Sequence, residues 1–315
     1  MLKSGVIGVG KLGTFHAEKH VILQREFPLR FLGVFDLDRD RAQNCQKFLK
    51  HRYDVDIKCY HSAEDLLGEV DLVTIATPAS NHHHMVSLAL KYGRHVLVEK
   101  PLALGAQLGE QLRDRALEKN LYLAVGHSER WNPAVGAIRS LVADWTPIYL
   151  EFVRHGPYQK RVTDVSVVDD LMIHDLDLFW FLFSKEMNLV SAASRIIDSQ
   201  FADVAGALFE GKTGDQNTFK VYFSAARWAP QLSRMIRGFF LEGSFVADLQ
   251  SLQVVYQKRG CQTEIMIFDK QDHIYLETRE FIKKIIHGDG EVCFAEDVIP
   301  SLRWRDLIEC YRGMS

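Results

Sequence analysis

The chain has 315 residues, a formal net charge of −3, 47% apolar residues and 25% charged residues. This length exceeds what one ordinary compact core holds and indicates two domains, and the composition is typical of a folded globular protein. A slightly negative charge without a basic block argues against nucleic acid as a partner.

The sequence favours a cytoplasmic location. No stretch approaches the length of a membrane span, so we expect no membrane partner, and the first residues run straight into a strand pattern without a signal-peptide core. The five scattered cysteines form no Cys-x-x-Cys pair, which suits free thiols in a reducing compartment.

Residues 1–125 alternate short apolar segments with amphipathic ones. Apolar segments without polar alternation predict strands that are buried on both faces of a parallel sheet, at 4–9, 31–35, 57–60, 72–76, 95–98 and 121–125. Helical patterns lie between them at 12–26, 39–50, 63–67, 81–92 and 105–119. The repeated strand–helix order predicts an α/β domain with a doubly wound parallel sheet of the Rossmann type.

Residues 126–315 have a different pattern and predict a second, α+β domain. A helix is expected at 168–183, and extended segments rich in β-branched and aromatic residues lie at 148–155, 189–198, 205–210, 218–225, 235–241, 244–248, 253–258 and 263–268. They predict a large, mainly antiparallel open sheet. The tail returns to helix at 274–287 and 300–312, and these helices can pack back on the first domain.

A glycine-rich turn links the first strand to the first helix and predicts a dinucleotide site. Gly8 permits a tight turn, Gly10 lets a pyrophosphate approach the backbone, and Gly13 allows close helix packing. Lys11 and Leu12 lie between the glycines at the helix N-terminus, whose amide groups face the phosphates. We therefore expect Gly8, Gly10, Lys11, Leu12 and Gly13 to bind the cofactor.

Asp36 follows the second strand, about 20 residues beyond the glycines, where a carboxylate can accept both hydroxyls of the adenosine ribose. The same charge repels a 2′-phosphate, and Leu37 stands where an arginine would favour one. We therefore predict NAD rather than NADP, although Arg39 and Arg41 are close in sequence. The alternative is that Asp36 only caps the next helix.

Ala76, Thr77 and Pro78 follow the fourth strand at the carboxyl edge of the sheet, where ligands bind in such folds. We expect these residues and His82 to contact the cofactor. His82 also begins a run of three histidines, which invites a metal interpretation. Adjacent helical residues point in different directions, so we favour helix capping and cofactor contact and predict no metal site.

Glu99-Lys100-Pro101 ends the fifth strand. A lysine at the mouth of an apolar strand is costly to desolvate unless its charge or its donors are used. Because burial shifts the pKa of lysine readily, Lys100 is a candidate for proton handling. Taken alone, it could equally extend its ammonium group to water.

Asp170, His174 and Asp177 are spaced so that they share one face of the helix expected at 168–183. A carboxylate one turn from an imidazole orients the ring and raises its pKa, which suits a general base. A divalent metal site and a purely structural polar network are the alternatives.

In combination, these residues resemble the Gfo/Idh/MocA family of nicotinamide-dependent oxidoreductases over essentially the whole chain. The resemblance is carried by Gly8-x-Gly10-x-x-Gly13, Thr77-Pro78-x-x-x-His82, Glu99-Lys100-Pro101, Gly126-His-Ser-Glu-Arg130-Trp-Asn-Pro133 and Asp170-x-x-x-His174-x-x-Asp177. It implies that Glu99 and Lys100 contact the cofactor and that Lys100 also contacts the reacting hydroxyl. It also implies that His174 is the acid/base, that Asp170 orients substrate or histidine, and that the second domain's sheet forms homodimers or homotetramers.

A narrower similarity, to UDP-N-acetylglucosamine 3-dehydrogenases and their close relatives, lies in residues 154–177. Arg154 and Arg161 precede the catalytic helix, where guanidinium groups can hold a diphosphate or sugar hydroxyls, and Arg130 can contribute. With Asp170 and His174, these arginines are the expected substrate contacts. Solvated surface arginines are the alternative.

The sequence therefore predicts an NAD-dependent dehydrogenase acting on CH–OH groups. The similarity implies oxidation of the 3-hydroxyl of a UDP-N-acetyl sugar to a 3-keto sugar. Two alternatives stay open. One is a dehydrogenase or reductase of a free sugar, inositol or other polyol; the other is an NAD(P)-binding regulator that kept the fold. Lys100 and His174 argue against the regulator, which needs neither.

Overall fold

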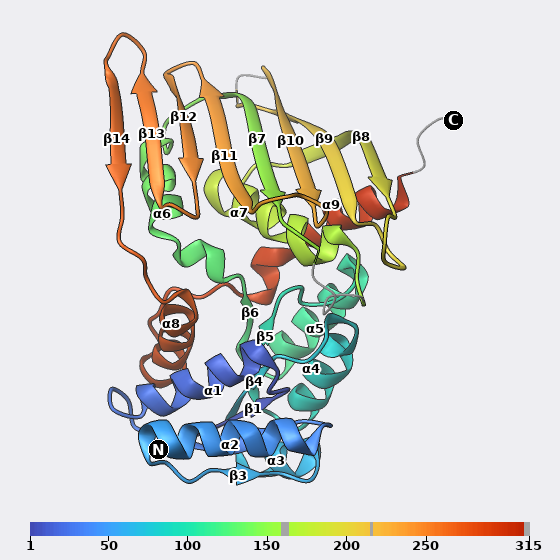
Figure 1. Cartoon of the computed structure of the whole chain (residues 1–315), viewed down its shortest axis with the longest axis vertical. Helices are drawn as coiled ribbons and strands as arrows, with labels where there is room; N and C mark the ends of the chain where they lie inside the picture. Colours follow the sequence, from blue (N-terminus) through green and yellow to red (C-terminus); the bar gives the residue numbers. More distant parts are fainter. Residues whose placement is uncertain (159–163, 215–216, 312–315) are drawn as a thin grey trace. The chain divides into compact units, whose positions relative to one another are not determined.

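The computed structural model describes residues 1–158, 164–214 and 217–311, and it divides into two compact units (Figure 1). Met1–Ser128 and Asp272–Ile299 form the first unit, and Glu129–Gln271 with the segment from Pro300 forms the second. The predicted ranges instead treat everything after residue 125 as one continuous domain. Within the described ranges, no helix has the length and apolar character needed to cross a membrane.

The first unit is built on a six-stranded parallel sheet in the order β3-β2-β1-β4-β5-β6. Its strands are β1 (Leu2–Ile7), β2 (Leu29–Phe35), β3 (Lys58–Cys59), β4 (Leu72–Ile75), β5 (His95–Glu99) and β6 (Leu123–Gly126). The chain runs from β1 to β2 and β3 on one side, and then returns to β4 on the other side of β1 and continues to β5 and β6. The predicted doubly wound sheet is therefore confirmed.

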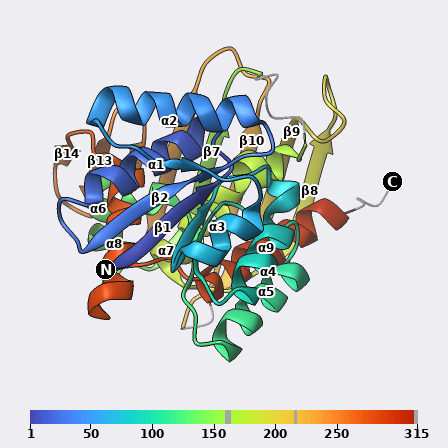
Figure 2. The same ribbon diagram turned by 90° about the horizontal axis from the view of Figure 1, so that it is seen from below.

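Helices cover both faces of this sheet. They are α1 (Lys11–Leu23), α2 (Arg39–Tyr53), α3 (Ala63–Glu69), α4 (His82–Lys91), α5 (Ala106–Glu118) and α8 (His273–His287). In Figure 2, α1 and α2 lie on one side of the sheet, and α3, α4 and α5 lie on the other. All four residues of β4 are buried, as a strand covered on both faces requires.

The starts of the helices follow from local sequence. Asp38 accepts hydrogen bonds from the amide groups of Asp40 and Arg41 at the start of α2. Ser62 caps α3 in the same way. Each side-chain oxygen satisfies an amide group that has no partner inside the helix, which is why these elements begin where they do.

The second unit contains an eight-stranded sheet in the order β14-β13-β12-β11-β7-β10-β9-β8 (Figure 1). Its strands are β7 (Pro147–His155), β8 (Met187–Arg195), β9 (Val204–Lys212), β10 (Thr218–Ala226), β11 (Ser233–Phe240), β12 (Gly243–Asp248), β13 (Gln253–Lys258) and β14 (Thr263–Ile267). All neighbouring pairs are antiparallel except β7 with β10. The predicted mainly antiparallel open sheet is confirmed.

Three helices accompany this sheet: α6 (Pro133–Leu141), α7 (Ile173–Phe183) and α9 (Ala295–Cys310). The sequence analysis did not predict α6. Its start carries a readable signal, because Asn132 caps it by accepting from the Ala134 amide, and Pro133 occupies the first turn.

An aromatic cluster fixes α7 against the sheet. Phe179 of α7 is fully buried, and its ring centroid lies 6.3 Å from that of Phe152, 6.2 Å from Phe219 and 5.7 Å from Trp304. Phe152 and Phe219 come from β7 and β10, and Trp304 comes from α9. Because aromatic pairs add energy beyond burial alone, Phe179 anchors the helix that carries His174.

We predict that Phe179→Ala lowers the free energy of unfolding by about 3–5 kcal/mol, because it removes a fully buried ring and leaves a cavity among five aromatic neighbours. Leu117→Ala in α5 is the control, since that side chain is 59% exposed. Urea unfolding followed by circular dichroism measures both. Equal losses in the two variants would contradict the anchoring role.

Candidate active site

The glycine-rich turn is closely packed at two positions and open at the third. Gly8 has φ +84°, and a Cβ atom there would lie 2.8 Å from the Thr77 amide nitrogen. A Cβ atom at Gly13 would lie 1.7 Å from the Gly8 carbonyl oxygen, whereas one at Gly10 would meet nothing within 4 Å. The turn is thus compatible only with glycine at two positions, and its backbone at Gly10 stays accessible to a ligand.

Asp36 ties the end of β2 to this turn. Its Oδ2 accepts from the Val9 amide at 2.7 Å, and its Oδ1 accepts from the Asp38 amide at 2.9 Å. Asp38, not Asp36, caps α2, so the helix-capping alternative for Asp36 is wrong. Each carboxylate oxygen keeps a further lone pair, which suits it to accept from a ribose hydroxyl.

His82 has a different environment from the one expected. The side chain is 1% exposed; its Nδ1 lies 2.7 Å from the Pro101 carbonyl oxygen and its Nε2 lies 2.9 Å from that of Thr77. Burial lowers its pKa, so the neutral ring donates to one carbonyl at a time. His82 therefore links the loops after β4 and β5, and we remove it from the expected cofactor contacts.

Ala76 and Thr77 are half-buried after β4, and Pro78 is exposed there. Lys100 is half-buried directly after β5. In a parallel sheet these carboxyl ends lie at one edge, as the sequence predicts. Across the described parts of the chain, no group of three or more His, Cys, Asp or Glu side chains is arranged to hold a metal ion.

A wide, π-type turn at Val168–Met172 leads into α7 and changes the expected spacing of side chains. Asp170 and His174 are half-buried on either side of this change. Asp177, one turn after His174 in α7, is fully buried. It receives two hydrogen bonds from Arg130, at 2.8 Å and 2.6 Å. The sequence pattern does not identify this partner of Asp177.

The side chain of Arg130 is held by two residues of α7. Its guanidinium binds Asp177 in a bidentate pair and lies 4.9 Å from the centre of the Phe181 ring. Bidentate pairing and stacking over an aromatic ring both fix the orientation of an arginine. We therefore assign Arg130 a structural role in holding α7, not the expected contact with substrate.

Arg154 is 3% exposed and lies in a buried ionic cluster that the sequence analysis missed. It donates to Asp175 at 3.1 Å and 2.8 Å, and to Glu129 at 3.2 Å. Glu129 also accepts from Arg234 at 2.8 Å. Burial raises the pKa of Asp175 although Arg154 opposes the rise. The solvated-surface alternative is therefore wrong for Arg154, and the guanidinium donors that would bind a substrate are directed to Asp175 and Glu129.

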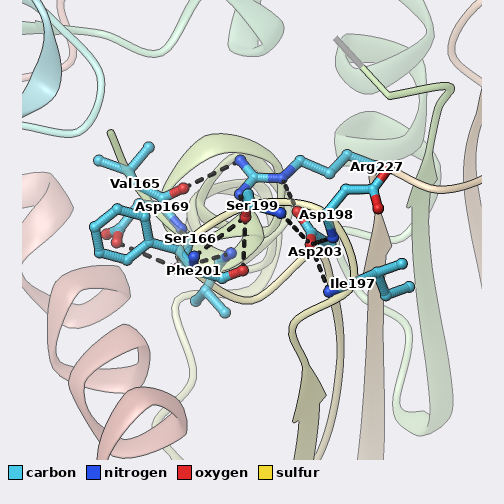
Figure 3. A network of polar contacts seen from close by, with 10 residues as sticks. Val165, Ser166, Asp169, Ile197, Asp198, Ser199, Phe201, Asp203 and Arg227 are labelled. Atoms are coloured by element: carbon cyan, nitrogen blue, oxygen red, sulfur yellow. Dashed lines mark hydrogen bonds and ion pairs between the residues drawn. The ribbon is translucent and has the colours of Figure 1, made fainter. Parts of the chain in front are cut away.

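The segment before the π-type turn is held by a second buried pair (Figure 3). Asp203 accepts from the amides of Ile197, Asp198 and Ser199 at 2.7, 2.9 and 3.2 Å, and from Arg227 Nε at 2.8 Å. Arg227 also donates to the Val165 carbonyl oxygen at 3.0 Å. The pair therefore connects the loop after β8 to the chain entering the helix.

Asp169, within the π-type turn, is held by α9. Arg305 of α9 donates to both of its carboxylate oxygens at 2.7 Å. Ser166 donates to Asp169 at 3.3 Å and to Glu309. The ion pairs of Asp169 and Asp203 thus fix the segment of chain that carries Asp170. Helical spacing in the sequence identifies neither pair. Arg161, the remaining expected substrate contact, lies outside the described residues.

A glycine-rich turn between β1 and α1, a carboxylate at the end of β2 and a parallel sheet that extends to both sides of β1 are the features of a dinucleotide-binding Rossmann domain. A family model described as "Oxidoreductase family, NAD-binding Rossmann fold" matches residues 2–127. The chain belongs to this family, the Gfo/Idh/MocA oxidoreductases, and the predicted resemblance is confirmed.

Relatives extend the similarity over nearly the whole chain. A UDP-N-acetylglucosamine 3-dehydrogenase from Acidithiobacillus ferrooxidans is 32% identical over 293 residues, which cover 90% of this chain and 88% of that protein. Its solved structure has a TM-score of 0.86 at 30% identity and covers 98% of this chain and 96% of that one. A myo-inositol 2-dehydrogenase from Thermotoga maritima is 24% identical, covering 94% and 92%.

We predict that Asp203→Asn destabilises the protein by about 3 kcal/mol at pH 7, because Arg227 is left buried without its anion. The amide donors and Arg227 overcome burial and lower the pKa of Asp203. Its stabilising contribution is therefore present above the unfolded pKa, about 4, and is lost as the pH falls further. Urea unfolding at pH 7 and pH 3 should show the deficit shrinking in acid.

Asp198→Asn is the matched control for this prediction. Asp198 lies in the same loop, but its side chain is exposed. We expect a change within about 0.5 kcal/mol at both pH values. A comparable loss in the two variants would show that the loop, and not the buried pair, is responsible.

We predict that Gly10→Ala leaves the thermal midpoint unchanged within about 2 °C and weakens dinucleotide binding at least about tenfold, since the methyl group fits the protein but occupies the space for the phosphates. NADH fluorescence titration measures the affinity. Gly68→Ala, an equally open position in α3, should change neither quantity. Undiminished affinity in Gly10→Ala would refute the assignment of the turn.

Proposed function

We propose that the protein is an NAD-dependent dehydrogenase that oxidises the 3-hydroxyl of a UDP-N-acetyl sugar to a 3-keto sugar. The observation that carries this proposal is the 32% identity, over 90% of the chain, to a protein named UDP-N-acetylglucosamine 3-dehydrogenase. The chain retains both candidate reacting groups, Lys100 and His174.

The choice of NAD rests on Asp36. Two backbone amides hold its carboxylate in place beside the phosphate turn, where its charge would repel the 2′-phosphate of NADP. Arg41 is a poor partner for that phosphate, because its guanidinium lies 3.2 Å from the Asp38 carboxylate. The residues present therefore fit NAD, with Gly8, Gly10, Lys11, Leu12 and Gly13 around the pyrophosphate.

When bound, the nicotinamide supplies the acceptor for the hydride that leaves the sugar carbon. The protein supplies the remaining functions. Lys100 donates a hydrogen bond to the reacting oxygen and stabilises its developing negative charge, and His174 takes the hydroxyl proton. Asp170, one residue beyond the paired Asp169, orients the substrate or the imidazole. The products are the ketone, the reduced cofactor and a protonated histidine.

Substrate recognition does not use every arginine that the sequence suggests. Arg130 and Arg154 are engaged by Asp177, Asp175 and Glu129 and are excluded from this proposal. Arg161 stays a predicted contact for the diphosphate, because a guanidinium recognises phosphate oxygens in a bidentate manner.

We also propose a cytoplasmic homodimer or homotetramer formed through the eight-stranded sheet. Large apolar side chains stay exposed on its strands, which supports a surface that associates: Ile148, Val190, Phe239, Val246, Ile265 and Ile267.

We predict that Lys100→Met and His174→Ala each lower turnover at least about a thousandfold, because both groups act on the reacting oxygen. The Kd for NADH should stay within about threefold in His174→Ala, since His174 is expected to contact the substrate and not the cofactor. NADH fluorescence follows both reaction and binding. The substrates compared are UDP-N-acetylglucosamine, free N-acetylglucosamine and myo-inositol, each with NAD and NADP.

Because alcohol oxidation can have an unfavourable equilibrium, the assay includes an amino donor and a partner aminotransferase that consumes the ketone. The proposal requires a higher kcat/KM for the UDP-sugar than for the free sugar. A polyol oxidised faster than any UDP-sugar would replace it with the polyol alternative. Unchanged turnover in both variants would remove the mechanism.

A further inference from the structure

Glu99, the residue immediately before Lys100, forms a buried pair with a histidine from another element. His16 of α1 places its Nε2 2.8 Å from Glu99 Oε1. The two side chains are 1% and 12% exposed. The contact joins the helix that follows the phosphate turn to the end of the strand that carries the candidate catalytic lysine.

The backbone leaves room for this carboxylate. A Cβ atom at Gly126, the last residue of β6, would lie 3.2 Å from Glu99 Cα and 3.3 Å from its carboxylate. Such distances are tighter than ordinary van der Waals contact, so a side chain at 126 would press on Glu99. The carboxylate is thus enclosed between α1 and β6.

Titratable groups from three elements act on Glu99. They are His16 on α1, His82 on α4 and Lys100 on the adjoining loop, and the backbone of Gly126 in β6 packs against the carboxylate. Burial by itself raises the pKa of Glu99, but the hydrogen bond and charge of His16 and the charge of Lys100 hold the pKa below its usual value. Glu99 is therefore an anion in the folded protein.

The next histidine along α1 does not compete for this role. His20 is fully buried, its Nε2 lies 2.9 Å from Thr74 Oγ1, and burial lowers its pKa to about 3. It stays neutral at any pH at which the enzyme would work. His16 is thus the residue of α1 that contacts the carboxylate.

We propose that His16 is a positioning residue that acts on Lys100 through Glu99. By hydrogen-bonding the enclosed carboxylate, His16 keeps a negative charge beside Lys100, and that charge fixes the place and ionisation of the lysine that binds the reacting oxygen. The inference rests on the proposed function of Lys100, although the His16–Glu99 contact itself does not.

The consequence is a specific dependence on pH. Burial raises the pKa of Glu99, and the hydrogen bond with His16 counteracts that rise. Without a donor at position 16, the carboxylate therefore takes up a proton at a higher pH. The charge beside Lys100 then disappears while the solution is still close to neutral. As the pH is lowered, such a variant should therefore lose turnover at a higher pH than the unaltered protein.

We predict that His16→Phe, which keeps an aromatic ring but has no donor, moves the acid limb of the kcat–pH profile up by about one pH unit or more. His16→Gln supplies an amide donor and should recover most of this shift. KM and the Kd for NADH should stay within about threefold in both variants, because His16 contacts neither ligand in the proposal. Glu99→Gln should lower kcat at least about tenfold at every pH and leave only the acid limb that protonation of His174 produces.

A second measurement does not need turnover. In protein labelled with ¹³C at glutamate carboxyl groups, the Glu99 signal is the one missing from Glu99→Gln, and its titration is followed in the unaltered protein and in His16→Phe. A higher titration midpoint in the variant supports the proposal. An unchanged midpoint overturns it, whichever substrate the enzyme uses.

The two measurements separate the possible failures. A displaced midpoint with an unmoved acid limb overturns the link to Lys100, as does a variant that loses only thermal stability. Absence of turnover in every protein, with a displaced midpoint, refutes the proposed function and leaves the buried pair established. If His16→Phe does not fold, Glu99→Gln with undiminished kcat overturns the proposal by itself.

Discussion

The requirement that a buried charge have a partner determines the structure around the candidate site. A carboxylate or guanidinium removed from water is stable only when an opposite charge or several hydrogen-bond donors replace its hydration. In the first unit this applies to Glu99 with His16. In the second unit it applies to Arg154 with Asp175 and to Asp203 with Arg227. Each pair joins elements that the backbone alone would not hold together.

Several polar residues near the candidate site are directed into the protein interior. Arg154, Asp175, Asp177 and Asp203 are almost completely buried, and their hydrogen-bonding capacity is directed inward. A ligand would have to break an ion pair in order to reach them, and breaking a buried pair costs about 3–5 kcal/mol. Such residues can support a site, but they are poor candidates for binding a substrate that must come and go.

The sequence was sufficient for features that depend on local pattern. Continuous apolar runs identified the parallel strands, and alternation with turn residues identified the open sheet. The roles of Gly8, Gly10 and Gly13 also followed from the sequence, since each concerns the backbone at its own position. The helix α6 was missed, although Asn132 and Pro133 carried an ordinary start signal.

Partners distant in the sequence could not be predicted in this way. Arg130 and Asp177 are 47 residues apart, and His16 and Glu99 are 83 residues apart. Helical spacing placed Asp170 one turn from His174, but it does not register the π-type turn between them or the arginine that binds Asp177. His82 was misassigned for the same reason, because one of its two acceptors, the Pro101 carbonyl, is 19 residues away.

Lys100, Asp170 and His174 differ in exposure from the inward-directed polar residues. All three are half-buried, in contrast to the paired residues beside them in the chain, Asp169 and Asp175. A general base or an electrostatic stabiliser must be reachable by substrate and yet be held in one orientation. The alternation of a fixed, buried residue with a half-buried neighbour provides both properties. In this chain the neighbours of the candidate reactive groups therefore matter as much as the groups themselves: Glu99 beside Lys100, Asp169 beside Asp170, and Asp175 beside His174.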